Sequence, residues 1–210
     1  METILVADEH ELIRRSIRKI IEDFSRQYNF IEARTCTEVI QLLSSGQIQY
    51  VIFDPVLADG SIFSVGQTIL DYTSLVPMFV FSAKPERIYA TQLMRKGMRG
   101  YLCKDTSMNE LEKAIRIFLL GEIYISAFLR KTLIQATQSE FLVDPIGALS
   151  GRELEVAQYM TSGMSTDRIA RQLNIDATTA GTYRRRIFKK LDVDNVMELQ
   201  EKMLVYKLLK

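Results

Sequence analysis

A stretch in the first third of the chain places one carboxylate directly after an apolar run. Tyr50–Phe53 is apolar or aromatic, and Asp54 follows it, with Pro55 and then Asp59-Gly60 close behind. A short apolar run bounded by turn-forming residues is typical of a strand buried on both faces. We therefore expect Asp54 at the end of such a strand, where its carboxylate could act as a nucleophile or hold a cation.

Three more apolar runs end in polar side chains whose chemistry complements that of Asp54. The runs and their end residues are Ile4–Ala7 with Asp8 and Glu9, Met78–Phe81 with Ser82, and Gly100–Cys103 with Lys104. Three carboxylates in one cleft repel each other unless a cation lies among them, and oxygen ligands suit a hard ion such as Mg2+. A site of this kind suits phosphoryl transfer, in which Asp54 attacks while the metal ion and the lysine ammonium neutralise the phosphoryl oxygens.

Helices are predicted between these strands, and the alternation defines the fold class. Glu11–Gln27 carries apolar residues at spacings of three and four, which indicates a helix, and Phe30–Arg34 is a further predicted strand. The other predicted helices are one capped by Thr37 that runs through Leu43, and those at Phe63–Tyr72, Pro85–Lys96 and Ser107–Leu120. Strands that alternate with helices and are apolar throughout imply an α/β fold, a doubly wound five-stranded parallel sheet. In such sheets ligands bind at the carboxyl ends of the strands, so the strand-end residues should lie close together.

Length and composition limit the class of protein. The chain has 210 residues, of which 47% are hydrophobic and 25% charged, enough for one large domain or for two smaller ones with separate cores, and unlike a disordered or fibrous chain. No apolar stretch is long enough to span a membrane, and no basic region precedes an apolar one at the N-terminus, so we expect a cytoplasmic protein with no membrane partner. Cys36 and Cys103 lack a C-x-x-C spacing and are expected to be small hydrophobic residues in or beside strands.

The sequence after the predicted sheet changes in character. Residues 1–122 are assigned to the α/β domain, 123–148 to a helical extension (Ile123–Ala136) and linker (Thr137–Ala148), and 149–210 to a second domain of four helices with no strand. The expected helices of this domain are Arg152–Met160, Thr166–Leu173, Ala177–Leu191 and Val196–Leu209. From Leu149 onward there are 11 Lys/Arg and 8 Asp/Glu, a net charge of +3, which leaves −2 for the preceding residues.

The third of these helices is expected to present a basic face. On a helical wheel one side of Ala177–Leu191 collects Ala180, Tyr183, Arg184, Ile187 and Leu191, and the other collects Thr178, Thr182, Arg185, Arg186 and Lys189. Asp176 is expected to cap this helix, and Asn174-Ile175 forms a short turn from the helix before it. Two helices joined by a short turn, the second cationic on its exposed face, indicate a helix-turn-helix that binds double-stranded DNA.

The strand-end residues and their order resemble the receiver domain of two-component response regulators over about residues 1–120. The resemblance implies that Asp54 is the phosphoacceptor for a sensor histidine kinase and that Mg2+ is held by Asp8, Glu9, Asp54 and the carbonyl of Val56. It also implies that Ser82 and Lys104 contact the phosphoryl group, and that Tyr101, three residues before the lysine, turns inward as a switch.

The basic domain resembles the LuxR-type helix-turn-helix that follows receivers in the NarL/FixJ class. The motif is carried by Leu149–Val156, Gly163, Ile169-Ala170, Leu173–Ile175, Thr179 and Lys190-Leu191. The resemblance makes Thr182 and Arg185 contacts to the DNA groove, with Thr178 on the same face, and makes Arg184, Arg186 and Lys189 mostly phosphate contacts. The last helix would be a dimer surface.

Two positions beside Asp54 depart from the receiver pattern and keep alternatives open. Receivers usually have proline four residues after the phosphoacceptor, where this chain has Ala58, and Pro55 directly follows Asp54. The main interpretation is a transcription factor that is phosphorylated on Asp54, dimerises and binds DNA. One alternative is an atypical regulator that binds DNA independently of phosphorylation. Another is an aspartyl-phosphate phosphatase, but Val56 stands where that enzyme would need a second acid; the protein is therefore expected not to be an enzyme.

Overall fold

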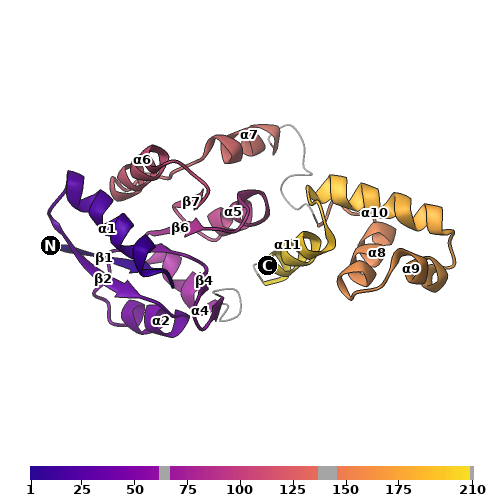
Figure 1. Cartoon of the computed structure of the whole chain (residues 1–210), viewed down its shortest axis with the longest axis horizontal. Helices are drawn as coiled ribbons and strands as arrows, with labels where there is room; N and C mark the ends of the chain where they lie inside the picture. Colours follow the sequence, from indigo (N-terminus) through magenta and orange to yellow (C-terminus); the bar gives the residue numbers. More distant parts are fainter. Residues whose placement is uncertain (62–66, 137–145, 209–210) are drawn as a thin grey trace. The chain divides into compact units, whose positions relative to one another are not determined.

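The computed structural model describes residues 1–61, 67–136 and 146–208, which form two compact units that divide between Ala127 and Phe128 (Figure 1). The first unit contains a five-stranded parallel sheet in the order β2-β1-β3-β6-β7. Its strands are β1 (Glu2–Ala7), β2 (Tyr28–Ala33), β3 (Tyr50–Phe53), β6 (Met78–Ser82) and β7 (Gly100–Cys103). The predicted doubly wound five-stranded sheet is confirmed.

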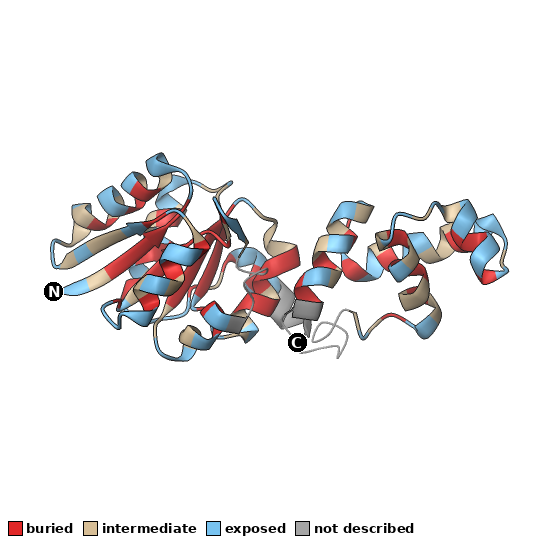
Figure 2. Cartoon of the chain, turned by 90° about the horizontal axis from the view of Figure 1, so that it is seen from below, coloured by how far each residue is buried: buried red, intermediate tan, exposed pale blue. Residues whose placement is uncertain are grey.

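The strand order reverses beside β1, and this reversal places helices on both faces of the sheet. The helices of the unit are α1 (Glu11–Phe24), α2 (Cys36–Ser44), α4 (Gln67–Leu70), the 3-10 helix η1 (Asp71–Ser74), α5 (Glu86–Arg95) and α6 (Met108–Leu119). Right-handed crossovers put α1 on one face and the helices that lead to β3, β6 and β7 on the other. Because strand residues on both faces are then covered, Leu5 and Val6 are both fully buried, and Figure 2 shows the buried residues in red along the strands.

The core of one face joins α1 and α6 to the sheet. Ile17 and Ile21 of α1 and Ile115 and Phe118 of α6 share one cluster of buried side chains with strand residues such as Ile52. The apolar spacing of three and four in both helices points these residues at the sheet. This packing holds the carboxyl ends of β1 and β3 in fixed register, with Ala7 paired to Phe53.

Two predicted elements of this unit differ from the structure, and one element was not predicted. The N-cap of α2 is Thr35, not Thr37, because Thr35 and Glu38 form a reciprocal capping box. Residues 123–126 are not helical, since Tyr124 packs its ring against Phe79 in the core. A short antiparallel hairpin of β4 (Val56–Leu57) and β5 (Gly60–Ser61), which was not predicted, follows Asp54.

Parts of two predictions lie outside the described residues. Of the predicted helix Phe63–Tyr72 the structure describes α4 and the start of η1, and residues 62–66 lie outside. Most of the predicted linker Thr137–Ala148 also lies outside, because residues 137–145 are not described. The predicted helical extension corresponds to α7 (Ala127–Ala136), four residues shorter at its start.

The C-terminal part of the chain contains the four expected helices. They are α8 (Gly151–Thr161), α9 (Thr166–Leu173), α10 (Ala177–Leu191) and α11 (Val196–Leu208), around a core that includes Val156, Ile169, Ile187 and Leu199. Within the described parts of the chain no helix is long and apolar enough to cross a membrane. Both cysteines are free; Cys36 is buried at the start of α2 and Cys103 is half-buried at the end of β7.

Candidate functional site

The carboxyl ends of the strands bring two carboxylates onto one ammonium group. Nζ of Lys104 donates to Oδ2 of Asp8 at 2.5 Å and to Oδ2 of Asp54 at 2.7 Å. Both acids are nearly inaccessible, with 2% of Asp8 and 7% of Asp54 exposed. Backbone hydrogen bonds join the four strand ends in two pairs, since Asp54 N–H donates to Ala7 O and Lys104 N–H to Ser82 O. Residues 96 positions apart in sequence therefore form one ion cluster.

The second oxygen of Asp54 is also held. Oδ1 of Asp54 accepts hydrogen bonds from Ser82 Oγ at 3.0 Å and from Val56 N at 2.9 Å. Ser82 itself is fully buried at the end of β6. The Asp54 carboxylate is thus oriented by a hydroxyl, a backbone amide and an ammonium, which are the donors that a phosphoryl group on this oxygen would need.

Lys104 remains charged in this environment. Burial disfavours its ammonium, but hydrogen bonds and attraction from Asp54 and Asp8 outweigh burial and raise the pKa of Lys104 above its ordinary value. The stabilisation from this cluster is therefore present below the ordinary pKa of 10.5 and is lost only as the pH rises through the raised value. At neutral pH the ammonium is available to neutralise an anion bound beside Asp54.

Tyr101 lies with its ring turned into the protein. Its side chain is fully buried, and its hydroxyl donates to Lys84 O at 2.8 Å. Burial raises the pKa of Tyr101 well above its ordinary value, so the phenol is neutral. The structure places Tyr101 beside the loop that follows Ser82, in the inward position.

Glu9 and His10 lie at the edge of the site. Both are exposed, and both line a cavity of about 580 Å³ together with Leu12, Ile13, Asp54, Val56, Ser82, Ala83, Lys84 and Lys104. The backbone N–H of His10 donates to Oδ1 of Asp8 at 2.9 Å. Glu9 thus lines the same cavity as Lys104, whose ammonium binds Asp8 and Asp54 directly.

The chemistry of the acid set fits a hard cation. Carboxylate oxygens of Asp8 and Asp54 meet at one point, and Glu9 lines the same cavity. Among the described residues no three acidic, histidine or cysteine side chains are gathered as a metal-binding group. The positive charge between Asp8 and Asp54 is supplied by Lys104 instead, and a cation would share these oxygens with it.

Arg14 is a member of the site that the sequence did not single out. Its guanidinium is buried, donates to Asp8 O at 2.8 Å and to Glu32 Oε2 at 2.7 Å, and so ties the turn after β1 to β2. Arg14 lies three residues before Ile17 and seven before Ile21, on the apolar side of α1. A charged residue within such an apolar stripe is the signal that could have identified it.

The predicted basic face is formed by α10. Thr178, Arg184, Arg185, Arg186 and Lys189 are exposed, and Thr182 is half-buried with its hydroxyl donating to Thr178 O at 3.0 Å. Ala180, Ile187 and Leu191 are buried on the opposite side. Arg184 is exposed although the helical wheel placed it on the core side, and its guanidinium lies over the ring of Phe188, 5.2 Å from the ring centroid.

The start and end of α10 are fixed by its neighbours. Asn174 adopts a left-handed conformation with φ of 52° and reverses the chain after α9. Asp176 is the N-cap residue of α10, as predicted, but its side chain makes no capping hydrogen bond. At the other end, Nζ of the buried Lys202 in α11 donates to Leu191 O at 2.6 Å.

An ion pair between the exposed Lys190 and the buried Glu153 joins α10 to α8. Nζ of Lys190 donates to Glu153 Oε2 at 2.7 Å and to Ala148 O at 3.1 Å, while Glu153 and Ser150 form a capping box at the start of α8. Burial disfavours the Glu153 carboxylate, but Lys190 and Ser150 outweigh burial and lower the pKa of Glu153. The Lys190 ammonium is therefore bound to α8 and to Ala148 O, although the residue, like Arg185 and Lys189, is exposed.

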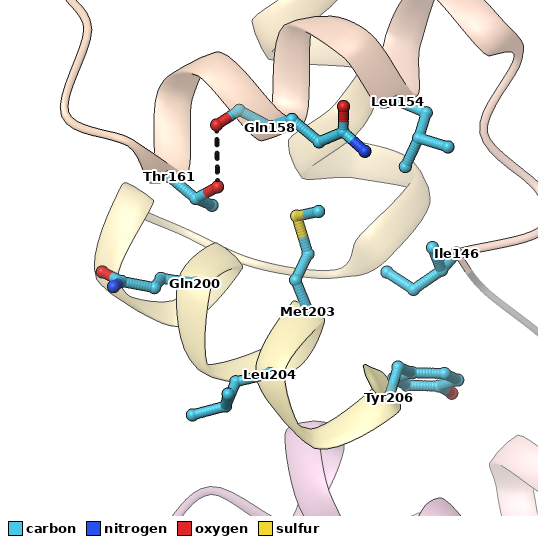
Figure 3. A pocket seen from close by; sticks show the side chains of 8 residues that line it. All are labelled: Ile146, Leu154, Gln158, Thr161, Gln200, Met203, Leu204 and Tyr206. Atoms are coloured by element: carbon cyan, nitrogen blue, oxygen red, sulfur yellow. Dashed lines mark hydrogen bonds between the residues drawn. The ribbon is translucent and has the colours of Figure 1, made fainter. Parts of the chain in front are cut away.

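A second cavity lies between α8 and α11. Its volume is about 490 Å³, and Figure 3 shows the residues that line it: Ile146, Leu154, Gln158, Thr161, Gln200, Met203, Leu204 and Tyr206. The side chains of Met197 and Leu204 on α11 are 76% and 50% exposed. Of these two exposed apolar residues, Leu204 lines the cavity.

Two family models cover the two parts of the chain. Residues 4–116 match the response regulator receiver domain, and residues 147–203 match the luxR family of bacterial regulatory proteins. Because the receiver model spans more than half of the chain, the protein belongs to the response regulators. It is of the NarL/FixJ class, with a LuxR-type DNA-binding domain after the receiver. Such proteins are transcription factors and typically not enzymes.

Individual relatives are similar over nearly their whole length. Response regulator UvrY of Escherichia coli (strain K12) is 28% identical over 200 residues, which cover 95% of this chain and 92% of UvrY. Response regulator GacA of Pseudomonas protegens is also 28% identical, over 95% of this chain and 93% of GacA.

Solved structures of similar fold include DNA complexes of another regulator. A structure of two RcsB dimers bound to two parallel DNAs superposes with a TM-score of 0.76 and 21% identity, covering 96% of this chain and 97% of that one. RcsB from Salmonella enterica serovar Typhimurium, bound to promoter P1flhDC in the presence of the phosphomimetic BeF3-, gives a TM-score of 0.75, 20% identity and 98% coverage of both chains. At this level of identity the likeness shows the fold.

Proposed function

We propose that this response regulator accepts a phosphoryl group on Asp54 and converts that modification into DNA binding through α10. The observation that supports it most directly is the arrangement of Asp54: its two carboxylate oxygens meet the ammonium of Lys104 and the hydroxyl of Ser82. An oxygen of Asp54 attacks the phosphorus of a phosphohistidine, the phosphorus–nitrogen bond breaks, and the phosphoryl group is carried as an acyl phosphate. The donor is a sensor histidine kinase.

Receiver domains typically use Mg2+ for phosphorylation. In this chain we assign the ion to Asp8, Glu9, Asp54 and the carbonyl of Val56. When bound, Mg2+ supplies positive charge that offsets the phosphoryl oxygens. The protein's own residues orient the group: Ser82 and Lys104 donate hydrogen bonds to it, and Arg14 keeps the Asp8 backbone in place.

Intact-mass analysis tests the phosphoacceptor. Native protein treated with a small phosphodonor and Mg2+ is expected to gain one phosphoryl group, and Asp54→Asn is expected to gain none. Asp71→Asn, an acid on η1 away from the strand ends, is the control and should be modified like the native protein. Equal modification of native protein and Asp54→Asn would remove the proposal.

For DNA, we assign base contacts to Thr182 and Arg185 and phosphate contacts to Arg184, Arg186 and Lys189, with Thr178 at the edge of the same face. The exposed basic side of α10 and its short turn from α9 support this assignment. Arg185→Ala should lose discrimination between operator and random DNA, whereas Lys189→Ala should weaken binding to both about equally. An equal loss on both DNAs for Arg185→Ala would contradict its role as a base reader.

The active form is proposed to be a homodimer that acts in the cytoplasm. Met197 and Leu204 of α11 are exposed apolar residues, and Leu204 also lines the cavity between α8 and α11 (Figure 3), which supports α11 as the dimer surface. We also propose the domain bounds: residues 1–122 form the receiver, 123–148 a helical extension and linker, and 149–210 the DNA-binding domain. Leu204→Glu should leave the chain monomeric in light scattering while α10 remains intact.

A second candidate is DNA binding that does not depend on phosphorylation. The inward, fully buried position of Tyr101 favours it, because the switch residue is already turned in without a phosphoryl group. The absence of proline at Ala58 and the presence of Pro55 point the same way. DNA affinities measured with and without BeF3- separate the candidates: a clear increase supports the phosphorylation switch, and equal affinities support the alternative.

A further inference from the structure

The loop after Asp54 is an isolated hairpin that needs an external anchor. Val56 pairs with Ser61 and Leu57 with Gly60, and this two-stranded ribbon is separate from the five-stranded sheet. Ribbons of two short strands are marginally stable by themselves. Since the first residue of this ribbon is Val56, whatever anchors the hairpin also determines where the Val56 backbone lies.

Asp59, at the tip of the hairpin, binds the N-terminus of α2. Oδ1 of Asp59 accepts from Cys36 N at 2.6 Å, and Oδ2 accepts from Thr37 N at 3.1 Å and from Thr37 Oγ1 at 2.9 Å. The first backbone N–H groups of a helix have no partner within it. Asp59 satisfies two of these groups and Thr35 satisfies a third, that of Glu38, at 3.1 Å. Two caps from different parts of the chain thus share one helix start.

A backbone hydrogen bond adds to this anchor at the position where receivers usually have proline. Ala58 N–H donates to Arg34 O at 3.0 Å, a bond that proline could not make. The pKa of Asp59 is lowered, first by the hydrogen bond from Cys36 N, so the carboxylate is charged at neutral pH and also favourable at the positive end of α2. In this chain, the side-chain bonds of Asp59 to the start of α2 and the backbone bond of Ala58 to Arg34, just before α2, hold the hairpin where a proline ring is usual.

The other end of the hairpin reaches the phosphorylation site. Val56 N–H donates to Asp54 Oδ1 at 2.9 Å, and Ser61 Oγ donates to Pro55 O at 3.1 Å. Pro55 between them has no N–H and a fixed φ. Val56 is therefore positioned from one side by Asp54 and from the other by the hairpin that Asp59 holds.

We propose that Asp59 is a positioning residue for phosphorylation of Asp54: by fixing the hairpin to α2 it holds the amide and carbonyl of Val56 where the phosphoryl group and Mg2+ need them. The inference rests on the proposed function, since it assigns the Val56 carbonyl to the metal ion. Asp59 itself contacts neither the ion nor the phosphoryl group. Groups that orient a ligating group typically change metal affinity by about 10–100-fold when removed.

The test compares Asp59→Ala with Thr35→Ala in the full-length chain. Both variants remove a cap from α2 and should lower the thermal midpoint similarly, but only Asp59→Ala releases the hairpin. Amide exchange measured by NMR without Mg2+ should quicken at Val56 by roughly tenfold or more in Asp59→Ala and stay near native in Thr35→Ala. Asp59→Asn, which keeps one acceptor oxygen and the size of the side chain, should fall between native and Asp59→Ala.

Two further measurements connect the hairpin to the site. Calorimetric titration with Mg2+ should show at least about tenfold weaker binding to Asp59→Ala, and intact-mass time courses should show correspondingly slower phosphorylation, with both near native in Thr35→Ala. Equal Mg2+ affinity and equal phosphorylation rate in the two variants would overturn the inference while leaving the proposed function standing. Native protein that neither binds Mg2+ nor gains a phosphoryl group would overturn both.

Discussion

At the scale of single residues, the site depends on how Lys104 compensates buried acids. Two carboxylates with little access to water would repel each other, and the ammonium of Lys104 lies within hydrogen-bonding distance of both. The lysine side chain itself is 16% exposed. Removing one partner of a buried ion cluster leaves an uncompensated buried charge. The stability lost in this way is larger than the stability that the intact cluster adds relative to apolar side chains in the same place.

We predict that Lys104→Met lowers the free energy of unfolding by about 3 kcal/mol in the absence of Mg2+. Addition of Mg2+ should recover part of this loss, because the ion supplies positive charge between Asp8 and Asp54. Lys113→Met is the control: its ion pair with Glu110 is on the surface of α6, so its loss should stay below about 1 kcal/mol. Urea unfolding of the three proteins with and without Mg2+ measures these differences, and equal losses in the two variants would contradict the role of Lys104.

At the scale of elements, α10 contains a glycine that the fold does not require. A Cβ added to Gly181 would meet nothing within 4 Å, and the residue has no positive φ. Glycine in the middle of a helix costs backbone entropy relative to alanine. The helix that carries the basic face is thus less stable than the same helix with alanine at position 181 would be.

Gly181→Ala should stabilise the protein by about 1 kcal/mol, because helix propensity improves without a steric clash. Gly163→Ala is the matched control in the same part of the chain. Gly163 has a φ of +85° at the end of α8, so alanine there should destabilise by about 1 kcal/mol although it too meets nothing within 4 Å. Thermal unfolding followed by circular dichroism should show shifts of opposite sign, and a loss of stability in Gly181→Ala would contradict the prediction.

The contact between α8 and α10 should be sensitive to acid. The pKa of Glu153 is lowered below its ordinary value of 4.5, so its ion pair with Lys190 stabilises the fold above about that pH and is lost as the pH falls through the lowered pKa. Lys190→Met should cost about 1 kcal/mol at neutral pH, a modest figure because the lysine side chain is 39% exposed.

The difference in stability between native protein and Lys190→Met should therefore narrow as the pH falls from neutral to below 4. Urea unfolding at several pH values measures it. Lys189→Met, on the exposed side of the same helix, should show no such convergence with pH. A difference that is constant across the series would mean that the Glu153–Lys190 pair does not contribute.

At the scale of the whole molecule, charge is divided unevenly along the chain. The residues from Leu149 onward carry a net charge of +3, and the preceding ones carry −2. Binding to DNA by such a basic part releases counterions, and its affinity therefore falls with salt. The acidic receiver part should contribute no phosphate contacts.

Lys189→Ala should reduce the slope of log affinity against log salt by about one for each protomer, because one phosphate contact is lost. Lys113→Ala in the receiver part should leave the slope unchanged. Fluorescence anisotropy with labelled operator DNA at several salt concentrations gives both slopes. An unchanged slope for Lys189→Ala would place this residue outside the DNA interface.

The sequence by itself determined the fold class and most of the element order. Apolar runs and spacings of three and four are local patterns, so β1, β3, β6 and β7 and the helices α9 and α10 appear close to their predicted bounds. The position of Asp54, Ser82 and Lys104 at strand ends followed from the same patterns. In a parallel sheet the carboxyl ends of all strands lie at the same edge, independently of the conformation of the loops.

The tertiary structure decided the contacts between residues far apart in sequence. The bridge from Lys104 to Asp8 spans 96 positions, and the bond from Asp59 to Thr37 spans 22. No local pattern specifies which carboxylate accepts from which donor, because that depends on how loops return to the sheet. For the same reason Thr35 rather than Thr37 caps α2, since the amide and hydroxyl of Thr37 are already bound to Asp59.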